Sequence, residues 1–541
     1  MKKVFNLLLF ISLFLLCSCS EETMETETME PEPVTFTGND VNVLSYNDKL
    51  STFIEKPYVI NEDFYNFITT DKEYIDNDKI VDNAIYVSND GNGDGSINNP
   101  CSIYNAVNKV EPGQTIYLRG GNYDLTGTVN INKSGTKDNY ITIRNYPNEH
   151  VCLSTSRDVT KTKEYVVMDI QRNVSYLKIE GLEIANITAK NSLGILLSEG
   201  GQSHIIIRNN SIHDMKTSIT NMNDSSAGAN AILLLGELDS SINNVLIYGN
   251  ECYNNVTGWC ETISVSGNCE GVYVVENYVH DNTNIGIDFY GNAGYCSSEE
   301  LDQPRYCVAA LNKVEDTFCE YADAAGLYVD GARDVLLTNN TIIHCQYGIE
   351  IGAEELSEGY LVKNVVVKNN LIRNNDTCGL RIGGYDAKEC GYVTSTKIYN
   401  NTIVNSSNGS SGLITISKVD GIEFVNNLVY TSSNKPLVTG DMSRTYTKNL
   451  TFRNNYFNNE KVDKNEFKFG LYNESQKGLD AFNSLVKGDN ITGKISIDKD
   501  CHVLSGVTIN AGDNSLDCGL YDIELKNRIN GGSIDIGAYE Y

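Results

Sequence analysis

One short phrase built around an asparagine recurs along the chain and constrains the fold more than any other feature. It reads apolar-x-apolar-x-x-Asn-x-apolar, and it occurs at Asn210, Asn250, Asn277, Asn312, Asn340, Asn370, Asn401, Asn427 and Asn455. The intervals between successive asparagines are 40, 27, 35, 28, 30, 31, 26 and 28 residues. A base period in the high twenties with occasional surplus indicates one structural unit that repeats and carries loops.

A second phrase, Gly-apolar-x-apolar, accompanies most units, at Gly194, Gly286, Gly326, Gly348, Gly379 and Gly412. Short alternating strands between Asn and Gly turns, with no helical period, exclude a helix bundle and a doubly wound sheet. We therefore predict an all-β fold, a parallel β-helix of about ten rungs. Asparagines at the same turn of each rung are expected to bond to one another in an internal column.

Three segments then resemble a known family. These are AIYVSNDGNGDGS to GGNY (Ala84 to Tyr123), YITIRNYPNE from Tyr140, and the closing NGGSIDIGAYEY. They resemble the carbohydrate-active right-handed parallel β-helix proteins, the pectate-lyase-like superfamily. The resemblance covers Ala84 to Tyr541 and implies a right-handed single-stranded solenoid with a C-terminal cap. The superfamily includes lyases, glycosidases, epimerases and binding proteins, so it implies a carbohydrate partner but no single reaction.

Within that opening, the segment SIYNAVNKV (residues 102–110) is expected to form an amphipathic helix that covers the exposed edge of the first rung. Residues 84–541 would then be the β-helix, and residues 37–83 an N-terminal extension. We expect the protein to be a monomer.

The N-terminus has the pattern of an export signal. An apolar run from Val4 to Leu16 follows two lysines and is too short to span a bilayer, which predicts a signal peptide at residues 1–18. The sequence Leu16-Cys17-Ser18-Cys19 resembles a bacterial lipobox with Cys19 lipidated. An acidic tether follows at residues 19–36 and resembles the export signal of surface lipoproteins of Bacteroidetes type. We therefore expect a lipid-anchored protein on the outer membrane, with a periplasmic inner-leaflet lipoprotein as the alternative.

Charge and cysteine content narrow the possible partners. The chain has 42 basic and 71 acidic side chains, a formal charge of −29, which opposes nucleic-acid binding. Thirteen of the fifteen cysteines follow Cys19 and form no CxxC pair. We expect buried thiols in a repetitive core rather than zinc ligands or disulfides.

Outward positions can be read from the repeat, because successive side chains of a strand point to opposite faces. In the Gly-apolar-x-apolar phrase the apolar residues face the coil and the x residues face outward. Charge appears in the outward columns only in the middle rungs. The residues gathered there are Asp288, Asp330, Glu350 and Arg381, with the aromatic residues Tyr290 and Tyr328.

This cluster predicts a glycoside hydrolase that needs no cofactor. Asp330 and Glu350 would be acid and base in unassigned order, Asp288 would support them, and Arg381 and Tyr328 would position the substrate. Parallel strands lie about 4.8 Å apart, which places these carboxylates at separations that suit inversion, roughly 6.5 to 9.5 Å. We expect both carboxylates to point into solvent and to bury little area.

Substrate-binding residues are expected around the same sheet. Tyr290, Glu261, Trp259, Glu354 and Asp386 lie on the outward columns or just beyond strand ends. Long insertions at residues 291–306 and 354–360 leave the same end of these strands, and such loops commonly form the walls of a cleft.

Two other functions remain open. In a calcium-dependent polysaccharide lyase, Asp288, Asp330 and Glu350 would hold Ca²⁺ and Arg381 would abstract a proton. It ranks second because the outward columns contain no lysine and the acidic protein opposes an anionic substrate. The third function is a non-catalytic glycan-binding or adhesive β-helix.

Overall fold

The computed structural model describes residues 43–71, 80–354, 362–386, 388–407, 410–440 and 442–541. Cys19, the predicted signal peptide and the predicted tether lie outside this part of the chain. Among the described residues, no helix combines the length and the apolar character that a membrane span requires.

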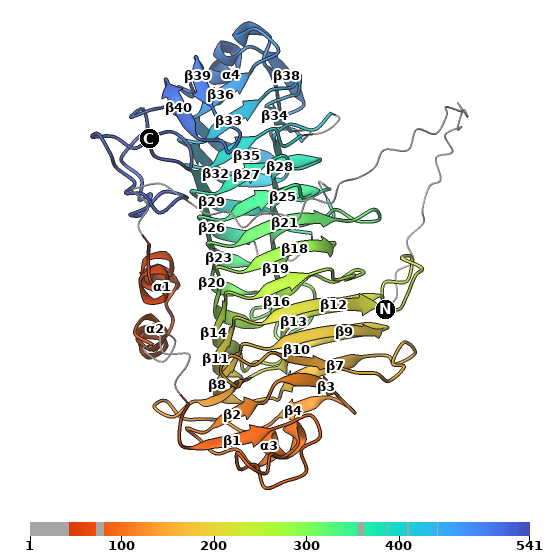
Figure 1. Cartoon of the computed structure of the whole chain (residues 1–541). Coiled ribbons are helices and arrows are strands. Elements are labelled where there is room, and N and C mark those ends of the chain that lie inside the picture. Colours follow the sequence, from red (N-terminus) through yellow and green to blue (C-terminus); the bar gives the residue numbers. More distant parts are fainter. Residues whose placement is uncertain (1–42, 72–79, 355–361, 387, 408–409, 441) are drawn as a thin grey trace, which may run out of the picture. The chain divides into compact units, whose positions relative to one another are not determined.

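The solenoid consists of three parallel sheets, named here sheets I, II and III, to which successive strands contribute in turn (Figure 1). Sheet I contains β1 (Ala84–Val87), β2 (Thr115–Leu118), β5 (Ile141–Asn145), β8 (Ser175–Glu180), β11 (Ser203–Arg208), β14 (Ile242–Tyr248), β17 (Cys269–Val275), β20 (Arg305–Ala310), β23 (Arg333–Thr338), β26 (Val362–Lys368), β29 (Val393–Tyr399), β32 (Val419–Val425) and β35 (Thr447–Arg453).

Sheet II contains β4 (Val129–Ile131), β7 (Tyr165–Ile170), β10 (Asn191–Glu199), β13 (Gly228–Gly236), β16 (Ile263–Gly267), β19 (Ile287–Tyr290), β22 (Ala325–Asp330), β25 (Tyr347–Gly352), β28 (Cys378–Ile382), β31 (Ile414–Ile416), β34 (Val438–Thr439), β37 (Lys468–Leu471) and the antiparallel β38 (Glu474–Lys477).

Sheet III contains β3 (Gly121–Asp124), β6 (Val151–Ser154), β9 (Glu183–Ala189), β12 (Ser211–Thr217), β15 (Glu251–Tyr253), β18 (Tyr278–Thr283), β21 (Lys313–Phe318), β24 (Thr341–Ile343), β27 (Leu371–Arg373), β30 (Thr402–Val404), β33 (Leu428–Thr431) and β36 (Tyr456–Asn459). A hairpin of β39 (Ile495–Ile497) and β40 (Val503–Gly506) lies outside the three sheets.

This architecture confirms the predicted right-handed parallel β-helix, but the number of rungs was underestimated. Sheets I and II have thirteen strands each and sheet III has twelve, against the expected ten or so. The difference arises at the N-terminal end, where four strands of sheet I precede β11, the strand of the Asn210 phrase, and the recurrent phrase is absent from them.

The asparagine column is confirmed as an unbroken ladder. Asn340 is fully buried; its backbone N–H and its Nδ2 both donate to Oδ1 of Asn370, at 2.9 and 3.0 Å. Its Nδ2 also donates to the carbonyl of Ala309 at 2.9 Å. The same pattern links every predicted asparagine from Asn210 onward and continues to Asn490. In each rung, the backbone N–H and the side-chain amide of the asparagine therefore both donate to the asparagine of the next rung.

Helices close the two ends of the apolar interior. Helix α3 (Ile103–Lys109) is the predicted cap, and the side chain of Ser102 accepts a hydrogen bond from its first turn. At the other end α4 (Leu479–Val486) buries Phe482, whose ring packs edge-on against Phe452 at 5.3 Å. A short 3-10 helix, η3 (Lys464–Glu466), precedes it. The thirteen cysteines from Cys101 onward are free thiols and are buried except for the half-buried Cys260.

The extension before the solenoid forms helices that the sequence did not reveal. Helix α1 (Tyr46–Phe53), the 3-10 helix η1 (Lys56–Tyr58) and α2 (Glu62–Thr69) pack on the outer, apolar face of sheet I (Figure 1). Beyond α2, Asp71 forms a buried ion pair with Arg208 at 2.9 Å, and Arg208 also pairs with Glu180 at 2.6 Å. The extension is thus part of the folded unit.

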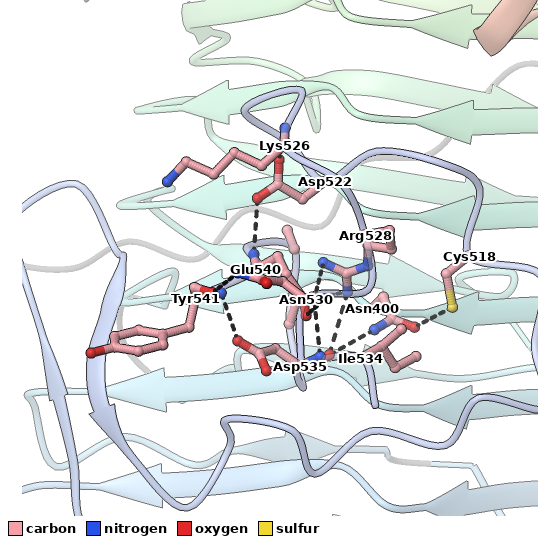
Figure 2. A network of polar contacts seen from close by, with 12 residues as sticks. Asn400, Cys518, Asp522, Lys526, Arg528, Asn530, Ile534, Asp535, Glu540 and Tyr541 are labelled. Atoms are coloured by element: carbon pink, nitrogen blue, oxygen red, sulfur yellow. Dashed lines mark hydrogen bonds and ion pairs between the residues drawn. The ribbon is translucent and has the colours of Figure 1, made fainter. Parts of the chain in front are cut away.

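The closing motif forms a cap in which carboxylates bind backbone amides (Figure 2). Asp535 accepts the N–H of Tyr541 at 2.9 Å, and Glu540 accepts the N–H groups of Asn530 and Asp535 at 3.1 Å. Asn400 of the solenoid donates to the carbonyl of Asp535 at 3.0 Å, which attaches the cap to the turn after β29. The arrangement explains why this end of the chain has a recognisable sequence.

We expect Asn340→Asp to destabilise the protein by about 3 kcal/mol or more, because it removes a buried amide donor and adds a charge beside the next carbonyl oxygen. Thermal unfolding would measure the effect. The matched control is Asn374→Asp, at an exposed turn position of the next rung, which should change stability little. Equal effects of the two substitutions would show that the ladder does not stabilise the fold.

Stability should also depend on His502, whose ring nitrogens contact Asp498 at 2.7 Å and Glu524 at 2.6 Å. The hydrogen bond to Glu524, supported by Asp498, raises the pKa of His502 to about 9. A raised histidine pKa gives stability that is full below the unfolded value near 6.5 and is lost as pH rises through about 9. The midpoint temperature of thermal unfolding should therefore fall between pH 7 and pH 10, and it should fall more steeply for the wild type than for His502→Gln.

Candidate functional site

The outward column of sheet II has the predicted register. Ser264 pairs with Asp288, Asp288 with Tyr328, Tyr328 with Glu350, and Glu350 with Arg381 on successive strands from β16 to β28. Because the pairing shows no slip, these five side chains occupy equivalent positions on neighbouring rungs.

A second outward column lies two residues further along the strands. It contains Tyr290 and Asp330, and Asp330 pairs with Gly352 on the next strand. A Cβ at Gly352 would lie 2.3 Å from the Tyr328 hydroxyl, so glycine makes room for that ring. The Tyr328 hydroxyl thereby reaches Glu354 just beyond β25 and donates to its Oε1 at 2.9 Å.

A cavity of about 440 Å³ opens in front of β16, β19 and β22. Its acidic lining consists of Glu261, Asp288, Asp323, Asp330 and Glu354, and its aromatic lining of Trp259, Tyr290, Tyr295 and Tyr328. None of the described lining residues is a lysine, arginine or histidine. Residues 355–361, which follow Glu354 in sequence, contain no basic residue either.

The predicted exposure of the carboxylates was wrong. Asp288, Asp330 and Glu350 are only 1, 5 and 4% exposed. The outward face is covered because side chains from segments beyond the strands, including Tyr295 and Asp323, stand over it and wall the cavity. The acidic cluster is therefore held in a low-dielectric recess rather than on a solvated face.

Burial and mutual repulsion perturb these acids. Burial raises the pKa of Asp288 well above its usual range, and the charges of Glu261, Asp330 and Glu354 raise it further. Burial, followed by Glu354 and Glu350, does the same to Asp330. Burial also raises the pKa of Glu261 to about 7. Strongly interacting acids titrate as a set, so the cluster holds protons at neutral pH that isolated carboxylates would lose.

Arg381 lies beside this cluster and forms ion pairs with two acidic side chains. Its Nη1 contacts Asp323 at 2.6 Å and Glu350 at 3.3 Å, and its guanidinium lies over the Tyr347 ring at 5.1 Å. The Tyr347 hydroxyl also donates to Asp323 at 3.2 Å. Burial lowers the pKa of Arg381, but the two carboxylates outweigh it and leave the pKa above its usual value.

The structure separates the predicted residues into two groups. Asp288, Asp330, Tyr290, Tyr328, Glu261, Trp259 and Glu354 line the cavity, whereas Glu350, Arg381 and Asp386 are not among its described lining. Glu350 lies next along the column, where burial raises its pKa to about 7 against the influence of Arg381. Asp386 instead accepts the backbone N–H groups of Lys388 and Glu389 at 2.6 and 3.0 Å.

Asp323 and Tyr295 line the cavity but were not predicted. Both lie outside the strands, in segments between β21 and β22 and between β19 and β20. The repeat predicts the positions of strand residues only. The one signal in the sequence for a residue such as Tyr295 was the length of the segment between β19 and β20. Part of the other predicted wall, residues 355–361, lies outside the described residues.

The calcium ligands suggested by the sequence do not fit one ion. Glu350 is paired with Arg381, whereas Asp288 and Asp330 line the cavity. Within the described ranges, the only group of His, Cys, Asp or Glu whose ligand atoms all lie within 4.8 Å of one another is Glu315, Asp316 and His344. These three belong to or follow strands of sheet III, not sheet II.

Two family models match the chain. The Pel9A-like right-handed β-helix region matches residues 85–346, and the general right-handed β-helix region matches residues 308–389 and 325–509. Together the matches extend over most of the solenoid.

Individual proteins add further likenesses. The uncharacterised protein YwoF of Bacillus subtilis is 29% identical over 418 residues, 74% of this chain and 85% of that protein. Pectate lyase PEL9 of Emericella nidulans is 46% identical over 72 residues, 13% of this chain and 18% of that protein. The solved lacto-N-biosidase of Eubacterium ramulus is 16% identical, with a TM-score of 0.44 over 69% of this chain and 67% of that one.

We expect Asp288→Asn to raise the thermal midpoint by several degrees at pH 8 and by much less at pH 5. A carboxyl group whose pKa is raised in the folded state lowers the stability of the protein as pH rises above the pKa of the unfolded state. The amide does not titrate and has no such effect. Asp386→Asn is the matched control. Hydrogen bonds to backbone N–H groups lower the pKa of Asp386, so its replacement should not stabilise the protein at pH 8. A loss of stability in Asp288→Asn at pH 8 would contradict the repulsion described here.

Proposed function

We propose that this right-handed β-helix protein is a glycoside hydrolase whose reaction takes place in the cavity of sheet II. The observation that carries the proposal is the pair Asp288 and Asp330. Both carboxyls are buried, both line the cavity, and both have a raised pKa.

The separation of the pair suits hydrolysis with inversion. Asp330 lies one strand along and two residues onward from Asp288, which places their backbones about 8 Å apart. Inverting glycosidases need carboxyls roughly 6.5 to 9.5 Å apart, because a water must fit between the sugar and the base.

Asp288 is assigned as the acid and Asp330 as the base. Burial and neighbouring carboxyls raise the pKa of both groups. The assignment rests on two differences: Asp288 is the more buried of the two, and its Oδ1 has no hydrogen-bond partner among the described residues, which disfavours its ionised form. It would donate its proton to the glycosidic oxygen as the bond from that oxygen to the anomeric carbon breaks. Asp330 would accept a proton from water, whose oxygen attacks the anomeric carbon from the opposite face.

Glu350 and Arg381 then have a positioning role. Arg381 joins the buried Glu350 to Asp323 at the cavity, so it fixes one wall without touching the reacting bond. This differs from the assignment suggested by the sequence, in which Glu350 was one of the reacting pair. The change rests on the cavity, which Asp288 and Asp330 line and Glu350 does not.

A polysaccharide lyase is the second candidate, and a pectate lyase is among the relatives in sequence. Such a reaction needs a base that removes the proton next to a uronate carboxylate. Arg381 was the candidate base, but its two ion pairs keep it protonated. The cavity offers no other basic side chain among its described residues, which favours hydrolysis.

We expect Asp288→Asn and Asp330→Asn each to lower kcat by about 10² to 10⁴-fold, the usual contribution of a general acid or base. Glu350→Gln should lower it less, and Asp386→Asn should leave it unchanged. Release of reducing ends from a panel of plant and animal polysaccharides would measure activity. EDTA should have no effect, and the products should lack the ultraviolet absorbance of an unsaturated uronate. Activity lost with EDTA and restored by Ca²⁺, or unsaturated products, would indicate the lyase; no turnover on any polysaccharide would favour a binding protein.

A further inference from the structure

Five carboxyl groups line the cavity, and no basic side chain accompanies them among the described residues. From this charge we infer that the sugar bound in the cavity carries no acidic group and is held through hydroxyl or amino hydrogens. The inference rests on the hydrolase proposed above and specifies its substrate class.

The cavity presents hydrogen-bond acceptors that require a donor. Oδ1 of Asp288 is buried and has no hydrogen-bond partner within the described part of the chain, although Asp288 lines the cavity. Whether Asp288 is protonated or ionised, at least one of its carboxyl oxygens only accepts hydrogen bonds. Sugar hydroxyls and ammonium groups supply the missing donors, whereas a uronate carboxylate or a sulfate ester would bring further acceptors.

Among the described residues that line the cavity, none carries a positive charge that would neutralise an acidic sugar. The nearest guanidinium in the column, Arg381, already pairs with Asp323 and Glu350. A uronate would have to break one of these ion pairs, and the freed carboxylate would remain close by. Its own charge would also lie near the proposed base Asp330, in a recess with little solvent screening.

An uncharged surface at the cavity complements this selection. Trp259 is 38% exposed and lines the cavity, and its ring lies 5.2 Å from that of Tyr321. Its indole Nε1 donates to the carbonyl of Met222 at 2.9 Å, which fixes the ring. An indole face binds the apolar face of a sugar ring without any contribution from charge.

The test uses three sets of oligosaccharides offered together to the full-length protein. The neutral set comes from galactan, arabinan, xylan and mannan; the amine set from glucosamine oligomers; the acidic set from oligogalacturonides, alginate and chondroitin sulfate. Captured oligosaccharides and released products would be identified by mass spectrometry. We expect capture and cleavage within the neutral or amine set, and at least tenfold weaker capture of the acidic set.

Each outcome decides one proposal. Capture and hydrolysis of acidic oligosaccharides would overturn the inference and leave the hydrolase standing. If no oligosaccharide of any set is captured or cleaved, the hydrolase proposal is overturned, and the inference with it. Cleavage confined to the neutral set would identify hydroxyls as the donors, and cleavage confined to the amine set would identify ammonium groups.

A charge-addition variant tests whether charge, rather than shape, excludes acids. Leu235 is half-buried, lines the cavity and pairs with Ser266, so its replacement removes none of the five carboxyls. Leu235→Lys should increase capture of oligogalacturonides about tenfold relative to Leu235→Gln, which changes the same position without adding a charge. Equal capture of acids by the two variants would overturn the role assigned to charge.

Discussion

The buried amide-to-amide hydrogen bond between asparagines of successive rungs is the interaction on which the rest of the structure depends. Every turn in a β-helix interior leaves backbone groups that water cannot reach, and each must find a partner. An asparagine amide both donates and accepts, so one side chain serves the rung before it and the rung after it. Aspartate of the same shape could not, because it lacks the donor. The ladder from Asn210 to Asn490 therefore fixes the register of all three sheets over most of the solenoid.

Fixed register explains how a cluster of repelling acids can persist. Asp288 and Asp330 are outward residues, yet the strands that carry them are anchored by the internal ladder and by apolar side chains that face the coil. Because these strands are anchored, the backbone cannot shift to relieve the repulsion between the two carboxylates. Burial, the larger cause, and this repulsion together raise the pKa values of both groups, and a carboxyl with a raised pKa can act as a proton donor at neutral pH.

The sequence predicted mainly the features that recur with the repeat, and not the positions of the segments between strands. The asparagine ladder follows from the repeat, and the alignment of Asp288, Tyr328, Glu350 and Arg381 follows from alternation within its strands. The cap helix α3 follows from an amphipathic segment before the first repeats. The burial of those acids could not be read in this way, because it depends on segments between strands whose path no period specifies. Asp323 illustrates the point: it is exposed and unremarkable in sequence, and only the fold brings it to Arg381.

The two ion-pairing neighbours of Arg381 link the cavity wall to the solenoid and also limit its chemistry. A guanidinium shared by Glu350 and Asp323 stays protonated, and it holds Asp323 at the cavity. Arg381 therefore cannot serve as a base, and it offers no free positive charge to an acidic sugar. The same contact thus opposes the lyase alternative and an anionic substrate, and in the proposed hydrolase it leaves proton transfer to the acids that line the cavity. In this solenoid, the hydrogen bonds inside the coil supply the rigidity, while the pairing of charges on the outer face of one sheet determines which reaction that face can perform.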